Sequence, residues 1–179
     1  MFFAALFKAQ VYLSVSFLFS YMQKKISLRY KKYRKGSVLM YYLKAEASFD
    51  SAHFLYGYEG KCSNIHGHRW KIEVTVQNAF LQRNGQQKGM IMDFSDLKRA
   101  VRLIAEHYDH SLIYEKNTLK SDTLECLKRD GFRLIEMPFR PTAENLARQF
   151  FTALKERGYR VSRVAVYETP ENCAMYDEG

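Results

Sequence analysis

Apolar and polar side chains alternate along two stretches of this chain, and a histidine lies at one end of each stretch. From Leu43 the odd positions are apolar or small and the even positions are polar, and the odd row continues to His53. From His68 the even positions form one apolar face, which consists of Trp70, Ile72, Val74 and Val76. Because successive side chains of a strand point to opposite faces, this period is typical of half-buried β-strands. The pattern predicts two strands, one that ends near His53 and one that begins near His68.

The period lengthens to that of a helix in two later segments. In the first, Asp93 or Ser95 can cap the helix, and its apolar face is Leu97, Ala100, Val101 and Ile104. In the second, Thr142 is the expected N-cap, Glu144 lies in the first turn and Gly158 ends the helix. The apolar stripe of this second helix is Leu146, Ala147, Phe150, Phe151 and Leu154.

Alternation returns near the C-terminus, where Val161–Glu168 and Ala174–Tyr176 are expected to be strands. Between the two helices lies an irregular region up to about Arg140, in which Thr123–Arg129 can form a short helix and Phe132–Met137 an extended piece. The principal elements therefore follow the order ββααββ. This order predicts an α+β fold with an antiparallel sheet and two helices packed on one face of it.

The composition, 47% hydrophobic and 26% charged, is that of a soluble globular protein. The net charge of +9 is confined to one end: residues 1–39 hold eight Lys or Arg and no Asp or Glu, which leaves 20 basic and 19 acidic residues in 40–179. Such a nearly neutral body does not favour binding to a phosphate backbone, so no nucleic-acid partner is expected. The break in composition predicts an N-terminal extension, 1–39, outside a single functional domain, 40–179.

The extension allows two interpretations. Phe2–Met22 is apolar and aromatic but is interrupted by Lys8 and several polar residues, and Lys24–Lys35 is strongly basic. A membrane span needs about 20 predominantly apolar residues, which this stretch only approaches. We favour an upstream extension of a product that natively starts at Met40. The alternative is a weak membrane-associating arm, and membrane contact is expected only if that arm is used.

The stretch from Cys62 to His68 carries the strongest chemical signal. His66 and His68 point the same way if the backbone is extended, and Cys62 lies four positions before His66. If the two strands pair antiparallel, His53 joins both histidines at one end of the sheet. Three imidazoles without an obvious fourth protein ligand describe a catalytic zinc site with one open position, so Zn²⁺ is the expected cofactor. The alternative is a loop that is rich in His and Cys by chance.

The remaining cysteines give no disulfide pattern. With Cys62, Cys126 and Cys173 the chain has an odd number of thiols at spacings that form no framework, which favours a reducing compartment and a cytoplasmic protein. Cys126 and Cys173 are expected to be passive thiols, and His107 is expected on a helix surface.

Six separated pieces of the sequence together resemble one family, the 6-pyruvoyltetrahydropterin and 6-carboxytetrahydropterin synthases. The pieces are Phe49-Asp-Ser-Ala-His53, Cys62-x3-His66-Gly-His68, Gly89-Met-Ile-Met-Asp93-Phe94-x2-Leu97-Lys98, Asp109-His110, Pro141-Thr-Ala-Glu-Asn-Leu146-Ala147 and Glu168-Thr169. The resemblance runs from about Met40 to the C-terminus. It implies the tunnelling fold (T-fold), in which protomers join their sheets into a barrel and usually form homo-hexamers with active sites between subunits.

The spacing between the thiol and the two histidines favours one branch of that family. A gap of three residues resembles the bacterial 6-carboxytetrahydropterin synthases of queuosine biosynthesis, whereas pyruvoyl-forming enzymes typically have a longer gap. The implied activity is that of a zinc-dependent lyase, which converts 7,8-dihydroneopterin triphosphate to 6-carboxy-5,6,7,8-tetrahydropterin, acetaldehyde and triphosphate. The alternatives are 6-pyruvoyltetrahydropterin synthesis and a pterin- or metal-binding module without turnover.

Four residues are candidates for the chemistry. Cys62, held as a thiolate near zinc and an imidazole, can act as the proton-abstracting base. Asp109 can fix the tautomer of His110, which then relays protons, although the two could also be an ordinary polar pair at a helix end. Glu168 lies on an apolar strand face, and the resemblance makes it the anchor for the pterin's amino and ring N–H groups and a part of the relay. The alternative for Glu168 is a side chain that points to solvent through sheet twist.

Two features stay open. Lys61, Arg69 and Lys71 are candidates for binding the triphosphate by proximity in sequence only. The segment Leu119–Arg140 is longer than a minimal connection and can be a simple surface elaboration.

Overall fold

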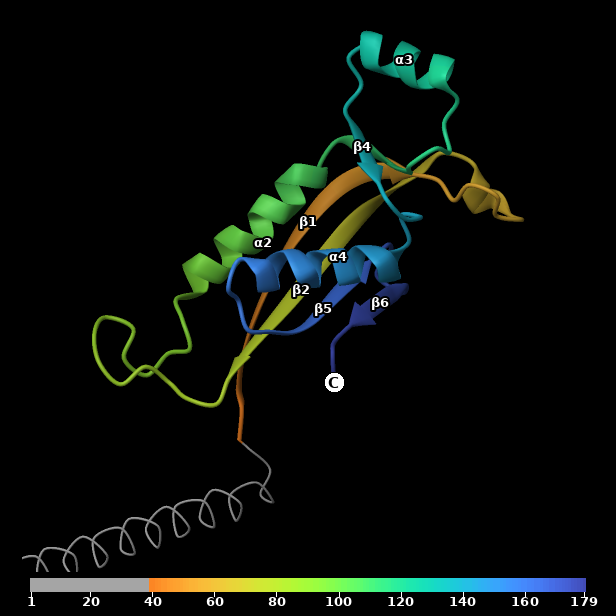
Figure 1. Cartoon of the computed structure of the whole chain (residues 1–179). Coiled ribbons are helices and arrows are strands. Elements are labelled where there is room, and N and C mark those ends of the chain that lie inside the picture. Colours follow the sequence, from red (N-terminus) through yellow and green to blue (C-terminus); the bar gives the residue numbers. More distant parts are fainter. Residues whose placement is uncertain (1–38) are drawn as a thin grey trace, which may run out of the picture. The chain divides into compact units, whose positions relative to one another are not determined.

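The computed structural model describes residues 39–179, and Figure 1 shows their arrangement. Met40–Gly179 forms one compact unit. The hypotheses about the N-terminal extension concern residues outside the described ones, so the extension and the boundary at Met40 stay predictions. None of the helices in residues 39–179 combines the length and the apolar character that crossing a membrane requires.

Two long strands form the centre of the sheet, as the alternation predicts. β1 spans Tyr41–His53 and β2 spans His66–Asn78, and the two pair antiparallel along their whole length. β5, Val161–Tyr167, pairs antiparallel with β2, and β6, Cys173–Tyr176, pairs antiparallel with β5. The predicted apolar face of β2 is its buried face.

The sheet is mixed, which corrects the prediction of an antiparallel one. β3, Ser111–Glu115, pairs parallel with the end of β1, and β4, Leu134–Met137, pairs parallel with β3. The strand order is β4-β3-β1-β2-β5-β6. β3 carries buried side chains on both faces, so its five residues show no alternation that would mark a strand. The class remains α+β, as predicted.

Two helices begin at the caps that the sequence predicts. α2, Phe94–Tyr108, follows Asp93, whose side chain accepts a hydrogen bond from the backbone N–H of Ser95 at 2.7 Å. α4, Ala143–Glu156, follows Thr142, whose hydroxyl accepts a hydrogen bond from the backbone N–H of Asn145 at 3.4 Å. These contacts satisfy N–H groups that a helix start leaves unpaired.

Both capped helices pack on one face of the sheet, as predicted (Figure 1). Phe49 of β1 meets Tyr108 of α2 and Phe150 of α4, with ring centroids 5.9 and 6.4 Å apart. A third helix, α3 (Ser121–Arg129), connects β3 to β4 and contributes no buried residue. The segment Leu119–Arg140 is therefore more than a surface elaboration, because it adds the edge strand β4 to the sheet.

The core extends to the histidine end of the sheet through Trp70, whose side chain is fully buried. Phe49 stacks on Trp70 with ring centroids 6.0 Å apart and an interplanar angle of 6°. On its other side the Trp70 ring lies 4.9 Å from His53 and 5.3 Å from His68, centroid to centroid. The indole N–H donates to the carbonyl of Ser51 at 3.3 Å. The two histidines thus lie on packed side chains, which restricts their rings.

Candidate active site

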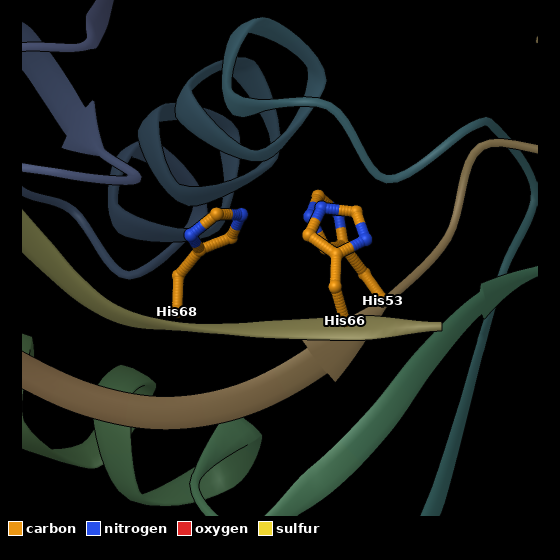
Figure 2. A group of neighbouring side chains, drawn as sticks. All are labelled: His53, His66 and His68. Atoms are coloured by element: carbon orange, nitrogen blue, oxygen red, sulfur yellow. The ribbon is translucent and has the colours of Figure 1, made fainter. Parts of the chain in front are cut away.

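Three histidines converge at the end of the β1–β2 pair, as the strand pattern predicts. His53 lies directly opposite His66 across the two strands, and His68 follows two residues later on the same face. Figure 2 shows the three rings gathered above the strands. Their ligand nitrogens all lie within 4.8 Å of one another. Such a cluster has the size of a mononuclear metal centre with imidazole ligands.

Backbone carbonyls orient two of the three rings. Nδ1 of His53 donates to the carbonyl of Pro141 at 2.8 Å, and Nδ1 of His66 donates to the carbonyl of Asn64 at 2.9 Å. Because a carbonyl only accepts, each of these Nδ1 atoms carries the hydrogen, and the lone pair of the neutral ring is on Nε2. This is the usual arrangement around a metal-binding histidine.

Two of these histidines bury a polar atom that has no partner. Nε2 of His53 and Nε2 of His68 are buried without a hydrogen bond, and among the described residues only the hydroxyl of Ser51 shares this condition. Leaving such an atom unsatisfied costs about 1–3 kcal/mol. A divalent cation between the rings would coordinate these nitrogens and remove that cost. The residues present therefore fit a metal of the zinc type.

Burial also keeps two of the rings, those of His53 and His68, neutral. The pKa of His53 is lowered to about 4, chiefly because burial disfavours the charged ring, and His66 and His68 add repulsion. The pKa of His68 is lowered as well, again chiefly by burial, although the carboxylate of Glu168 opposes that shift. A metal needs the neutral imidazole, so neither ring has to lose a proton before binding near pH 7.

A pocket of about 440 Å³ opens over the histidines, and two of the four candidate catalytic residues line it. Cys62 comes from the single-turn helix Lys61–Ser63, and its backbone carbonyl accepts a hydrogen bond from the N–H of Leu55 at 2.9 Å. Glu168 follows directly after β5 rather than lying within it, and it is half-buried. The pocket thus combines three imidazoles, a thiol and a carboxylate.

The Asp109–His110 pair lies outside this pocket. Oδ2 of Asp109 accepts a hydrogen bond from Nδ1 of His110 at 2.7 Å, while Oδ1 accepts one from the N–H of Asp50 at 2.8 Å. These hydrogen bonds, that of Asp50 first, hold the pKa of the Asp109 carboxyl below its usual value. His110 adopts φ 50°, an uncommon backbone conformation for a residue other than glycine, and its side chain is 81% exposed. The predicted pairing is present, but it faces solvent.

The three candidate triphosphate-binding cations separate into two groups. Lys61 lines the pocket. Arg69 and Lys71 lie on the opposite face of β2, where they pair with Asp50 at 3.3 Å and with Glu73 at 2.8 Å. The protomer therefore brings one of the three to the histidines.

The three residues that were expected to have no role in the site do not line the pocket. Cys126 and Cys173 are free and exposed, and His107 is exposed on α2.

Some residues of the site gave no usable signal in the sequence. The orienting carbonyls of Asn64 and Pro141 are backbone groups, which every residue has. Thr169 and Asn172 line the pocket from the turn between β5 and β6, which closes through the N–H of Asn172 on the carbonyl of Thr169. Thr169 was indicated only as part of the Glu168-Thr169 piece of the family resemblance, and nothing in the sequence indicated Asn172.

Comparison with known proteins places this arrangement in one family. The family of 6-pyruvoyl tetrahydropterin synthase matches residues 42–179. Among curated relatives, the 6-carboxy-5,6,7,8-tetrahydropterin synthase of Haemophilus influenzae is 38% identical over 142 residues, which cover 78% of this chain and all of that protein. The protein of the same name from Synechocystis is 33% identical and covers 76% of this chain and 93% of its own.

Solved structures show the same fold. An uncharacterised protein from Wolinella succinogenes superimposes with a TM-score of 0.64 at 23% identity, over 79% of this chain and 99% of that one. The 6-pyruvoyl tetrahydropterin synthase of Plasmodium vivax gives a TM-score of 0.58 at 22% identity, over 77% of this chain and 97% of that one. These likenesses support the predicted tunnelling fold.

Proposed function

Because this chain belongs to the 6-pyruvoyl tetrahydropterin synthase family, we propose that it converts 7,8-dihydroneopterin triphosphate and one water molecule to 6-carboxy-5,6,7,8-tetrahydropterin, acetaldehyde and triphosphate. The names of the curated relatives and the three-residue gap between Cys62 and His66 favour this product. The proposal makes the protein a cytoplasmic lyase that cleaves a carbon–carbon bond and supplies queuosine (7-deazaguanine) biosynthesis.

The observation that carries the proposal is the cluster of His53, His66 and His68 at the floor of the pocket. We assign Zn²⁺ to it, because three neutral imidazoles with one position open are typical of catalytic zinc. When bound there, zinc supplies a Lewis acid that lowers the pKa of the hydroxyl groups on the substrate's side chain.

The chain's own residues then bind the substrate and move protons. Cys62 lines the same pocket as the histidines and is the base that removes a proton from a carbon bearing a hydroxyl. Glu168 also lines this pocket and accepts hydrogen bonds from the pterin's amino and ring N–H groups.

Asp109 and His110 act across a subunit boundary in this proposal. Among the described residues, β3 pairs with β1 only over Ser51–His53, so the outer edge of β1 before that point has no strand partner. Such an edge is a ready template for another chain. The N–H of Asp50 at this edge binds Asp109, so His110 is presented where a neighbouring subunit would dock. We therefore propose a homo-oligomer, a hexamer by analogy with the family, in which His110 relays protons in a neighbour's pocket.

The pocket of one protomer has few positive charges for a triphosphate, which supports an active site shared between subunits. A triphosphate carries several negative charges, whereas Lys61 is the one basic side chain among the lining residues that the structure describes. Additional cations from a neighbouring subunit would complete the triphosphate site. No nucleic-acid partner is proposed, and membrane contact depends on residues 1–39 alone.

The rival activity within the family is 6-pyruvoyltetrahydropterin synthesis, which uses the same metal ligands. The test is product analysis after incubation of the purified protein with 7,8-dihydroneopterin triphosphate. Acetaldehyde and 6-carboxytetrahydropterin in equal amounts support the proposal. A pyruvoyl product without acetaldehyde overturns it. A binding module without turnover would bind the substrate and release neither product, although a pure binder has no need for the thiol.

A further inference from the structure

The loop between β1 and β2, residues 54–65 (the Cys62 loop), is weakly attached to the domain. Its base closes through the Leu55 N–H on the Cys62 carbonyl. Three further backbone hydrogen bonds lie within the loop, from the N–H of Tyr58, Ser63 and Asn64 to the carbonyls of Leu55, Gly60 and Lys61. No side chain from Tyr56 to Asn64 is buried. The loop that carries the candidate base therefore has little apolar packing to hold it in place.

Two side chains from other elements bind this loop. Nδ1 of His66 donates to the carbonyl of Asn64 at its end, and Nη2 of Arg140 donates a hydrogen bond to the carbonyl of Tyr56. Among the described residues, no hydrogen bond other than that of Arg140 joins 56–63 to a residue outside the loop. Because guanidinium is charged, a bond of this kind contributes more than one between neutral groups.

The backbone of Arg140 is itself fixed by the start of α4. Its carbonyl accepts hydrogen bonds from the N–H of Thr142 at 2.8 Å and from the side-chain amide of Asn145 at 3.0 Å. The guanidinium is thus held from a rigid base.

The turn of the loop leaves room for the guanidinium. Gly57 adopts φ +70°, and a Cβ at this position would lie 3.9 Å from Nη2 of Arg140. A side chain here would be strained by the positive φ, whereas its Cβ would be in ordinary van der Waals contact with the guanidinium. The glycine therefore permits the backbone conformation of the turn beside Arg140.

From these contacts we propose that Arg140 is a positioning residue that clamps the Cys62 loop to the start of α4. The next residue, Pro141, holds the ring of His53 through its carbonyl. Two consecutive residues thereby tie both the thiol and a metal ligand to one helix end. An effect of Arg140 on turnover rests on the proposed function, in which Cys62 is the base. The attachment of the loop by Arg140 can be tested without turnover.

The test compares Arg140→Met, which keeps an unbranched stem but removes the donors, with Arg140→Lys, which keeps a charged donor. Arg148→Met is the matched control, because Arg148 lies on α4 and contacts the ring of Phe139 rather than the loop. Two readouts are taken: hydrogen exchange of the Leu55 amide, and the alkylation rate of Cys62 by iodoacetamide resolved by peptide mass spectrometry. The exposed Cys126 and Cys173 serve as internal references.

We expect Arg140→Met to raise both the exchange rate and the alkylation rate about tenfold, the effect of losing one charge-assisted hydrogen bond. Arg140→Lys restores part of the difference, and Arg148→Met changes neither. In the assay with 7,8-dihydroneopterin triphosphate, kcat falls in Arg140→Met while its metal content equals that of the unmodified protein.

Two outcomes overturn the clamp. One is that the exchange and alkylation rates of Arg140→Met equal those of the unmodified protein, and the other is that both rates rise equally in Arg148→Met. If Arg140→Met does not fold, Arg140→Gln decides by the same two readouts. If the unmodified protein shows no turnover, the proposed function is refuted. Hydrogen exchange and alkylation still test the clamp in that case, because neither depends on turnover.

Discussion

His53 is the most constrained of the three histidines. It is 1% exposed, its ring lies between Trp70 and His66, and Nδ1 is held by the carbonyl of Pro141. Nε2 has no hydrogen-bond partner within the described residues, so it is available to a ligand between the rings. His66 is more exposed and can be replaced with less disturbance of the core.

Replacement of His66 by alanine therefore tests the metal site with least damage to the fold. Loss of one of three ligands should weaken Zn²⁺ binding by more than about 100-fold, beyond the effect of losing a residue that only orients a ligand. Competition with a chromophoric chelator measures the affinity. His107→Ala is the control, since His107 is exposed on α2, and equal affinities in the two variants would remove His66 from the site.

The metal-free protein should also lose stability in mild acid. In the folded protein His53 takes up a proton only near pH 4, whereas in the unfolded chain it does so near pH 6.5. Between these values the unfolded state binds the extra proton, so the free energy of unfolding falls as the pH drops from 6.5 toward 4, by about 3 kcal/mol at most. Urea titrations of chelator-treated protein across this range give the slope. His53→Asn should show a shallower slope, and identical slopes would contradict this assignment.

The sequence predicted which side chains lie together, but it did not predict which of these groups line the pocket. Alternation alone brought His53, His66 and His68 together, because strand register converts spacing directly into position. The carboxylate–imidazole pair of Asp109 and His110 was also predicted, and it is present. Its position outside the pocket was not predictable, since it depends on how α2 ends against β1 and not on local pattern.

The two helices that pack on the sheet differ energetically from the one that does not. α4 buries Phe150 to 1% exposure, whereas α3 buries no residue. Phe150→Ala should lower the free energy of unfolding by about 3–5 kcal/mol, because it leaves a cavity between sheet and helix. Leu124→Ala in α3 should cost less than about 1 kcal/mol. Denaturant unfolding of both variants measures the difference, and similar losses would show that α3 packs more tightly than its exposure indicates.

The long elements were predictable from their period, and the approximate positions of the short elements α3, β4 and β6 were predicted as well, whereas β3 was not. β1, β2, α2 and α4 each span 13 to 15 residues, and their period shows clearly. β3 and β4 have five and four residues, and their parallel pairing follows from the crossover through α3 rather than from any pattern in the strands. That is why the sheet was expected to be purely antiparallel.

For the assembled molecule, shared active sites predict that two inactive variants rescue each other. Cys62→Ala removes the proposed base of its own pocket, and His110→Ala removes the proposed relay for a neighbour's pocket. In co-expressed mixed oligomers about a quarter of the sites combine a native Cys62 with a native His110, so about a quarter of the activity should return. Each variant expressed alone is the control. If the mixture stays as inactive as its parts, the two residues serve the same subunit's site. If His110→Ala alone keeps full activity, His110 has no catalytic role.

The metal content of the purified, full-length protein tests the central claim most directly. Elemental analysis should find close to one zinc per chain. A strong chelator should remove it and abolish turnover of 7,8-dihydroneopterin triphosphate, and added Zn²⁺ should restore both. Protein that contains no metal and keeps full turnover in the presence of the chelator would contradict the assignment of these three histidines.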